Sequence, residues 1–225
     1  ALYRDPAQIG QWAASLPKAS SVVVYCVHGH QVSQGAAKAL NEYGIRAQFL
    51  EGAIAHWAED GGAIGAKPVN AHTRWVTRER PKIDRIACPW LIARFIDRGT
   101  EFLYVPTTDV RRVAAEREAV AYDVPDVAFT HVGEQCSFDA FIKTYRLGAD
   151  PALTRLAAIV RGADTGELDL APEAPGLLAM SLGLSRLYAD DHEMLRHGMV
   201  MYDALYLWCR DGQDETHTWN PDAYR

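Results

Sequence analysis

The stretch SVVVYCVHGHQVSQGAAKALNEYGIRAQFL, residues 21–50, decides the fold of the amino-terminal part of the chain. Residues 21–26 form an uninterrupted run rich in β-branched side chains, which is typical of a parallel strand covered on both faces. A polar loop at 27–32 follows, then apolar residues at helical spacing over 33–43, with Gly44 ending the helix before a second strand at 47–50. Strand, loop, helix and strand predict one βαβ unit with a parallel strand pair and a right-handed crossover.

The rest of the chain divides into a short opening helix, a linker and a second domain. Asp5 followed by Pro6 predicts the start of an amphipathic helix over 6–16. The segment GGAIGAKPVNA, 61–71, is rich in Gly, Ala and Pro and predicts a linker. We therefore predict an incomplete α/β domain at 1–62, a linker at 63–73 and a second, helix-rich α+β domain at 74–225. Its predicted strands are 75–77, 101–105, 120–124 and 128–132, and its predicted helices are 89–98, 109–118, 138–145, 151–161, 175–188 and 190–208.

Composition excludes several classes of protein. The chain has 225 residues, 48% of them hydrophobic, and a net charge of −6, so it is an ordinary globular chain with no general attraction to nucleic acid or an anionic membrane. Four separated cysteines without a CxxC pair favour a reducing compartment. No apolar run is long enough to span a membrane, and Ala1 does not open an export signal. These features predict a cytoplasmic protein without membrane or direct nucleic-acid partners.

The loop after the first strand carries the clearest chemistry. Cys26 ends the strand directly before a helix, where backbone N–H groups and the helix dipole can hold an anion and stabilise a thiolate. We predict Cys26 to be a reactive, catalytic thiol. The alternative is that Cys26 is only a small apolar residue at the end of a core strand. The predicted anion cradle around it consists of His28, Gly29, His30, Gln31 and Ser33.

In order along the chain, the strand VVVYC, the loop CVHGHQVS, the helix GAAKALNEYG and the segment FLEGAIAHW resemble the rhodanese (sulfurtransferase) domain. The resemblance implies that Cys26 carries a sulfane sulfur as a persulfide, taken from a small donor such as thiosulfate. It implies a sulfurtransferase or thiol oxidoreductase. Two features depart from the family: no strand of the type LIDVR precedes Asp5, and Gln31 stands where many rhodaneses have arginine.

Two further groups in the second domain are candidate ligand sites. Lys82 and Arg85 lie just before Cys88, the predicted N-cap of the helix 89–98, and predict an oxyanion site; ordinary pairing of the two cations with Asp84 or Asp97 is the alternative.

His131, on the inward face of the predicted strand 128–132, and His192 beside Asp191 are candidate metal ligands. As cofactor they suggest a divalent ion: zinc, manganese or iron. HEMLRH, 192–197, is not the HExxH motif, because its histidines are five residues apart. Capping of the last helix by Asp190 and Asp191 is the competing explanation.

The second domain also resembles the C-terminal domain of the chromate-resistance protein B family. Four separated blocks carry the resemblance in order: WVTRERPKIDRIACPWLIARFIDRGTEFLYVP, FTHVGEQCSFDAFI, IVRGADT and LSRLYADDHEMLRHGMVMYDALYLWCR. The resemblance implies a bacterial cytoplasmic protein that protects against chromate. We therefore predict a chromate-resistance protein with thiol chemistry on Cys26 and a second domain that binds an oxyanion or a metal. The alternative is a non-enzymatic chromate-responsive regulator, and a homodimer is left open.

Overall fold

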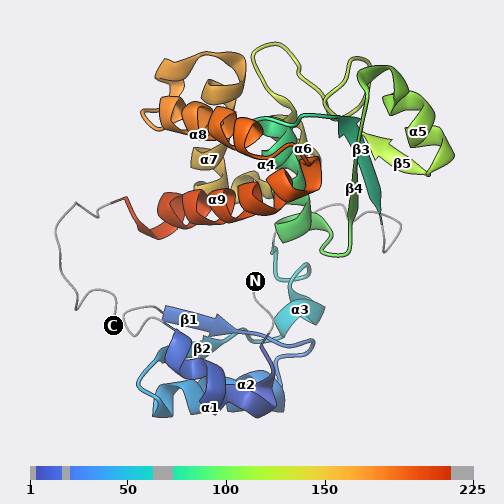
Figure 1. The fold of residues 1–225 in the computed structure, drawn as a ribbon. Helices are drawn as coiled ribbons and strands as arrows, with labels where there is room; N and C mark the ends of the chain where they lie inside the picture. The colour runs from blue at the N-terminus through green and yellow to red at the C-terminus, as the bar shows by residue number, and fades with distance from the viewer. Residues whose placement is uncertain (1–3, 17–20, 63–72, 214–225) are drawn as a thin grey trace. The chain divides into compact units, whose positions relative to one another are not determined.

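The computed structural model describes residues 4–16, 21–62 and 73–213, which form two compact units (Figure 1). One unit contains the described residues up to 62, and the other those from 73 onward. Residues 63–72 of the predicted linker lie outside the described part of the chain. None of the helices in the described residues has the length and apolar character needed to cross a membrane.

The amino-terminal unit contains the predicted βαβ arrangement. Strands β1 (Ser21–Val24) and β2 (Arg46–Phe49) are parallel, and α2 (Gln31–Glu42) connects them. Leu40 of α2 is fully buried against the strands, and Gly44 has a positive φ of 78° just after the helix, which favours glycine there. The remaining helices of this unit are η1 (Pro6–Gln8), α1 (Ile9–Trp12), η2 (Ala13–Ser15) and α3 (Ala53–His56).

The expectation that β1 is covered on both faces is wrong. Val22 and Val24 pack in the core with Ala13 and Leu40, but Val23 is 58% exposed on the opposite face. Successive side chains of a strand point to opposite faces, and the described helices that pack on β1 share one core. A run of valines indicates a strand, but it does not show whether one or both faces of that strand are covered.

The second unit is built on three parallel strands in the order β4-β3-β5. These are β3 (Arg74–Arg78), β4 (Glu101–Val105) and β5 (Ala119–Ala121). Between β3 and β4 lies α4 (Asp84–Leu91), which continues as a π-helix over Ile92–Ile96; η4 (Thr107–Asp109) and α5 (Val110–Glu116) lie between β4 and β5. The later helices are α6 (Ser137–Thr144), η5 (Leu147–Ala149), α7 (Pro151–Thr165), η6 (Leu168–Leu170), α8 (Ala174–Leu187) and α9 (Asp191–Asp211).

Different helices cover the two faces of this sheet (Figure 1). Trp75 and Phe102 face a large core shared with α4, α6, α7 and α9, in which the Phe129 and Phe141 rings stack 4.2 Å apart. Val76 points the other way and packs with Val110 of α5. The two crossover helices, α4 and α5, therefore lie on opposite faces, and the chain changes face between β3 and β5.

The helix predicted at 89–98 is displaced in the structure. It begins at Asp84, so Cys88 is a fully buried residue inside α4 and is not its N-cap. Pro89 lacks the N–H that would bond to the carbonyl of Arg85 four residues earlier. The Tyr104 hydroxyl donates to that carbonyl instead, at 3.4 Å, so the helix tolerates the proline.

The strand predicted at 128–132 is also wrong. This region has only two isolated bridges, from Tyr122 to Phe129 and from Val132 to Gln135. Asp123 and Asp126 both have positive φ and turn the chain away from β5. His131 consequently lies on a loop, with its side chain 41% exposed, and not on the inward face of a strand.

Candidate functional site

Cys26 lies in the loop between β1 and α2, and hydrogen-bond donors surround its sulfur. The Gly29 N–H donates to Sγ at 3.2 Å, and the Ser33 Oγ lies 3.3 Å from it. Gly29 has a φ of 72°, and a Cβ at this position would meet the Leu50 carbonyl oxygen at 2.8 Å. The close approach of the loop to the following strand therefore requires glycine, and it aims the N–H at the sulfur.

These donors lower the pKa of Cys26 from 9.0 to about 6. The Ser33 side chain contributes most, and the backbone N–H groups of His28, Ser33 and Gly29 add to it against partial burial. The Ser33 hydroxyl also lies 3.3 Å from the His30 carbonyl oxygen, but it has one proton to donate. When Cys26 ionises, a hydroxyl proton turned toward the sulfur stabilises the thiolate, which is the reactive form of cysteine.

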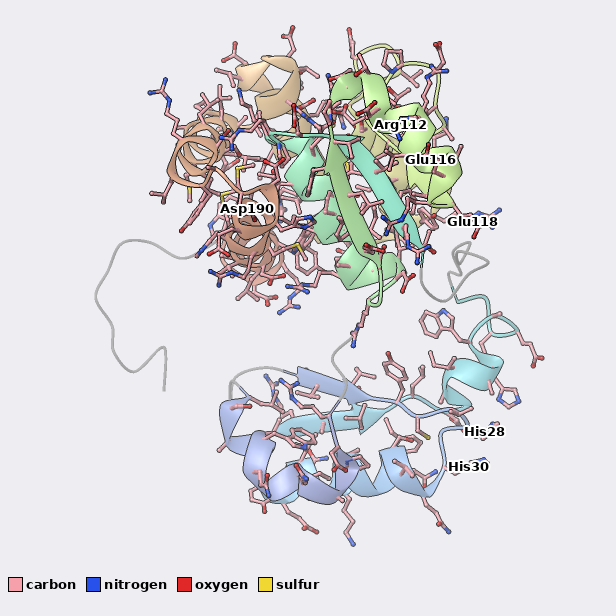
Figure 2. All side chains as sticks on the ribbon, turned by 45° about the vertical axis from the view of Figure 1, so that its right-hand side comes forward. His28, His30, Arg112, Glu116, Glu118 and Asp190 are labelled. Atoms are coloured by element: carbon pink, nitrogen blue, oxygen red, sulfur yellow. The ribbon has the colours of Figure 1, made fainter. Side chains whose placement is uncertain are left out.

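The other predicted cradle residues contribute less. The rings of His28 and His30 are exposed, with centroids 6.0 Å apart, at the same end of the unit (Figure 2). Gln31 is the exposed first residue of α2. The structure thus brings the backbone of the loop and Ser33 to Cys26, and leaves three side chains open to solvent.

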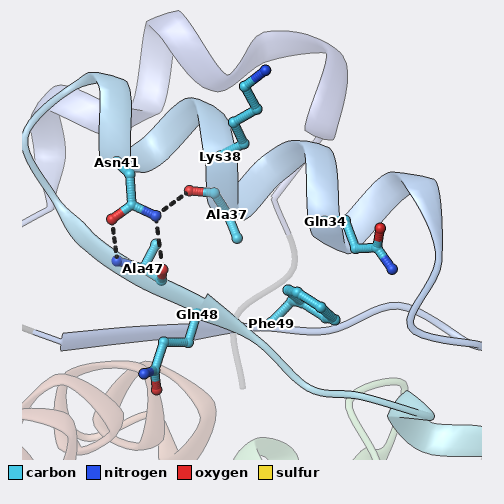
Figure 3. Close-up of a pocket in the computed structure, with 7 residues that line it drawn as sticks. All are labelled: Gln34, Ala37, Lys38, Asn41, Ala47, Gln48 and Phe49. Atoms are coloured by element: carbon cyan, nitrogen blue, oxygen red, sulfur yellow. Dashed lines mark hydrogen bonds between the residues drawn. The ribbon is translucent and has the colours of Figure 1, made fainter.

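A shallow groove of about 590 Å³ lies on another part of this unit, between α2 and β2 (Figure 3). Asn41 crosses its floor: its amide donates to the carbonyls of Ala37 and Ala47 and accepts from the Ala47 N–H. These bonds fix helix to strand. Cys26 does not line the groove, and the lining residue Gln34 donates to the Gly29 carbonyl of the Cys26 loop at 3.0 Å.

The second unit gathers titratable side chains around His131. Its Nε2 lies 3.2 Å from Asp164 Oδ2, 3.4 Å from Asp84 Oδ2 and 3.5 Å from Asp123 Oδ1. Asp123 is also paired with two cations, Arg78 at 2.6 Å and Arg85 at 3.2 Å, and accepts from the Ser137 hydroxyl at 3.0 Å. We call Asp84, Asp123, His131 and Asp164 the aspartate cluster.

The packing of helices fixes the position of Asp164. Arg161, one turn earlier on α7, makes a two-pronged pair with Asp139 of α6, at 2.9 and 3.0 Å. That pair sets the rotation of α7, so that Asp164 lies within 3.5 Å of the backbone N–H of Asp84. The Tyr202 hydroxyl of α9 donates to the carbonyl of Ile83 at 2.9 Å and holds the chain just before Asp84.

Burial and close contacts within the aspartate cluster shift the pKa values of its members. Hydrogen bonding to Asp84, with the other carboxylates, raises the pKa of His131 to about 9. Burial and the neighbouring Asp84 raise the pKa of Asp164 to about 7, and the same causes raise the pKa of Asp123. The cluster therefore holds protons near neutral pH that isolated residues would release.

The structure departs from the predicted ligand groups of the second domain. His131 is grouped with Asp84 and Asp164, whereas His192 faces the Tyr104 ring, with centroids 5.5 Å apart, and Asp191 accepts from the Arg80 N–H at 3.0 Å. The predicted oxyanion group of Lys82, Arg85 and Cys88 is not assembled: Cys88 is buried with its pKa raised by burial, and Arg85 pairs with Asp123. Lys82 is exposed.

Asp84, Asp123 and Asp164 were not predicted as site residues, and Asp84 was considered only as a partner of Lys82 or Arg85. Asp164 did leave a signal, because it follows Leu153, Ala157 and Val160 at helical spacing and so falls on the apolar face of α7. A carboxylate on such a face needs a partner. The sequence carries no such signal for Asp123, because its position depends on where β5 ends and on the turn that follows.

Comparison with known proteins identifies the second unit. Residues 75–209 match the family model described as ChrB, C-terminal domain. This chain belongs to the ChrB C-terminal domain family. It is 34% identical over 133 residues to Protein ChrB of Cupriavidus metallidurans, an alignment that covers 59% of this chain and 40% of that protein. The chain thus matches less than half of its ChrB relative, and no solved structure matches it.

The whole aspartate cluster falls inside the ChrB match, and Cys26 falls outside it. The two candidate sites therefore belong to different parts of the chain.

Proposed function

We propose that this protein acts in chromate resistance and that its amino-terminal unit is a rhodanese-like module in which Cys26 carries sulfane sulfur. Membership of the ChrB family supports the first part. The observation that carries the second is the pair of donors at the Cys26 sulfur, the Gly29 N–H at 3.2 Å and the Ser33 hydroxyl at 3.3 Å, between a parallel strand and a helix.

The proposed reaction uses thiosulfate as sulfur donor. The Cys26 thiolate attacks the outer sulfur of thiosulfate; a sulfur–sulfur bond forms to Sγ, and the bond to the sulfonate sulfur breaks. Sulfite leaves with that electron pair, and Cys26 becomes a persulfide anion. The charges balance, since a thiolate and a dianion give a persulfide anion and a dianion. Backbone N–H groups that stabilise the thiolate would also stabilise the persulfide.

Intact-mass measurement after incubation with thiosulfate tests this proposal. We expect a gain of about 32 Da, one sulfur, confined by peptide mapping to Cys26. Cys26→Ser should abolish the gain. The three other cysteines are buried and their pKa values are raised by burial, so they should remain unlabelled. A gain distributed over all four cysteines, or no gain, would contradict the proposal.

The alternative hypothesis, a non-enzymatic chromate-responsive regulator, predicts a different second step. A sulfurtransferase passes the sulfur to an acceptor such as cyanide and turns over, whereas a sensor keeps the modified Cys26. Chromate is a tetrahedral dianion, as sulfate is, and the loop N–H groups would donate hydrogen bonds to either. Sulfate, which does not oxidise thiols, should therefore slow the labelling of Cys26 in competition with thiosulfate.

A further inference from the structure

The aspartate cluster lies where an open parallel sheet usually binds a ligand. Arg78 ends β3 and Asp123 follows β5, so both stand at the carboxyl edge of neighbouring strands. In open parallel sheets, ligands bind outside the carboxyl ends of the strands. Asp84 opens α4 beside this position.

Three donor atoms at this edge have the spacing of a coordination sphere. Asp84, His131 and Asp164 each offer one ligand atom, and these atoms lie within 4.8 Å of one another. Nε2 of His131 is 3.2 and 3.4 Å from the two carboxylate oxygens. Metal–ligand bonds of about 2.1 Å at tetrahedral angles place neighbouring ligand atoms about 3.4 Å apart, so an ion needs little rearrangement here.

Asp84 carries a buried oxygen that is only loosely paired. The residue is 3% exposed, and its buried Oδ2 has the His131 Nε2 as its partner at 3.4 Å, longer than the usual charge-assisted hydrogen bond. A buried carboxylate oxygen held at that distance is incompletely compensated, which costs free energy. A cation bound directly to Oδ2 would lower that cost.

The remaining aspartate has a different role. Asp123 is engaged by Arg78, Arg85 and the Ser137 hydroxyl, so its charge is already compensated. Among the described residues, His131 is the ion-pair partner that Asp84 and Asp164 share; their other contacts are hydrogen bonds with neutral groups. Three ligands leave at least one coordination position open, and the 41% exposed side chain of His131 gives access to it from solvent.

We propose that Asp84, His131 and Asp164 bind a divalent first-row metal ion, such as Mn²⁺ or Zn²⁺, with a position left open for water or a small oxyanion. Imidazole favours these ions over Mg²⁺ and Ca²⁺, and two carboxylates suit Mn²⁺. This site lies in the ChrB-matched unit and does not rest on the chemistry proposed for Cys26.

Mn²⁺ is the best probe, because it binds thiolates poorly and so reports little from Cys26 and its neighbouring histidines. We would titrate the full chain with Mn²⁺, count free ion by electron paramagnetic resonance, and then displace the bound ion with Zn²⁺. We expect one ion per chain. Asp164→Asn and His131→Gln should weaken binding about 10-fold or more, because each removes a ligand.

Matched control variants separate this site from the group predicted by sequence. Asp191→Asn and His192→Gln make the same chemical changes outside the three-residue site and should bind Mn²⁺ as the wild type does. Melting curves without metal show that each variant is folded; since Asp84→Asn changes a buried residue, the two more exposed ligands carry the test. Cys26→Ser should retain full Mn²⁺ binding, so failure of the thiol proposal leaves this result unaffected.

Three results would overturn the metal site. A folded wild type that takes up no Mn²⁺ and no Zn²⁺ would show that His131 is simply an ion-pair partner of the aspartates. Equal binding by wild type, Asp164→Asn and His131→Gln would place the ion elsewhere. Loss of binding in His192→Gln equal to that in His131→Gln would favour the ligand group predicted by sequence.

Discussion

Replacing Ser33 by alanine should make Cys26 a weaker acid. Ser33 is 2% exposed, and its hydroxyl makes the largest contribution to lowering the pKa of Cys26 to about 6. The Gly29 N–H remains in the variant, so the pKa should move part of the way back toward 9.0. The reaction of Cys26 with a small disulfide probe, followed from pH 4.5 to 9.5, measures this change because only the thiolate reacts.

The expected effect has opposite signs at the two ends of the pH range. For each unit by which the pKa rises, the thiolate fraction at pH 4.5 falls about 10-fold, while the nucleophilicity of the thiolate rises about 3-fold. The rate should therefore fall about 3-fold per unit in acid and rise about 3-fold per unit above pH 9. The two pH–rate profiles should cross.

Ser15→Ala is the matched control. It removes a hydroxyl from the same unit, but that hydroxyl donates to the Trp12 carbonyl and not to the sulfur. Its profile should superimpose on the wild type. If the Ser33→Ala profile also superimposes, backbone N–H groups alone set the pKa of Cys26, and the role given to the serine proton is refuted. Cys26→Ser should abolish the fast reaction and so identify the reacting thiol.

Three further predictions concern the stability of the second unit. Phe141→Ala should lower the free energy of unfolding by about 3–5 kcal/mol in a urea titration, since this ring is fully buried and stacked on Phe129. Gly198→Ala should cost about 1–3 kcal/mol, because a Cβ there overlaps Ile86, whereas Gly183→Ala, facing open space, should not destabilise. Because the pKa of His131 is raised to about 9, its contribution to the free energy of unfolding is complete below about pH 6.5 and is lost as the pH rises through 9. In the presence of a chelator, the melting temperature should therefore fall between pH 7 and pH 9.5, and it should fall less in His131→Gln.

Sequence periodicity predicted β1, α2 and β2 of the amino-terminal unit because each depends on local signals, whereas the single helix predicted over 6–16 is divided into η1, α1 and η2. The valines of β1, the helical spacing in α2 and Gly44 are all read within a few residues. The exposure of Val23 was missed, because it depends on what packs against the strand. Likewise, Pro89 looked like the start of a helix, and only the hydroxyl of the distant Tyr104 allows it inside α4.

The two candidate sites differ in the same way, in how far apart in the sequence their residues lie. The donors around Cys26 come from the next few residues, so a strand followed by a helix was enough to anticipate them. The neighbours of His131 come from α4, the end of β5 and α7, and their meeting depends on strand order and on the Arg161–Asp139 pair. His192 was chosen as a partner for its residue type and stays a prediction, while Asp84 and Asp164 could be grouped with His131 only in three dimensions.

The bond from the Tyr202 hydroxyl to the Ile83 carbonyl joins residues 119 positions apart, so it can form only after Tyr202 has been synthesised. At about 5–20 residues per second, a ribosome needs about 6–24 s to reach Tyr202 after it has passed Ile83. During that interval α9 does not yet cover the apolar side of α4, which includes Trp90 and Leu91. The apolar side of α4 therefore stays incompletely covered for seconds after its own synthesis.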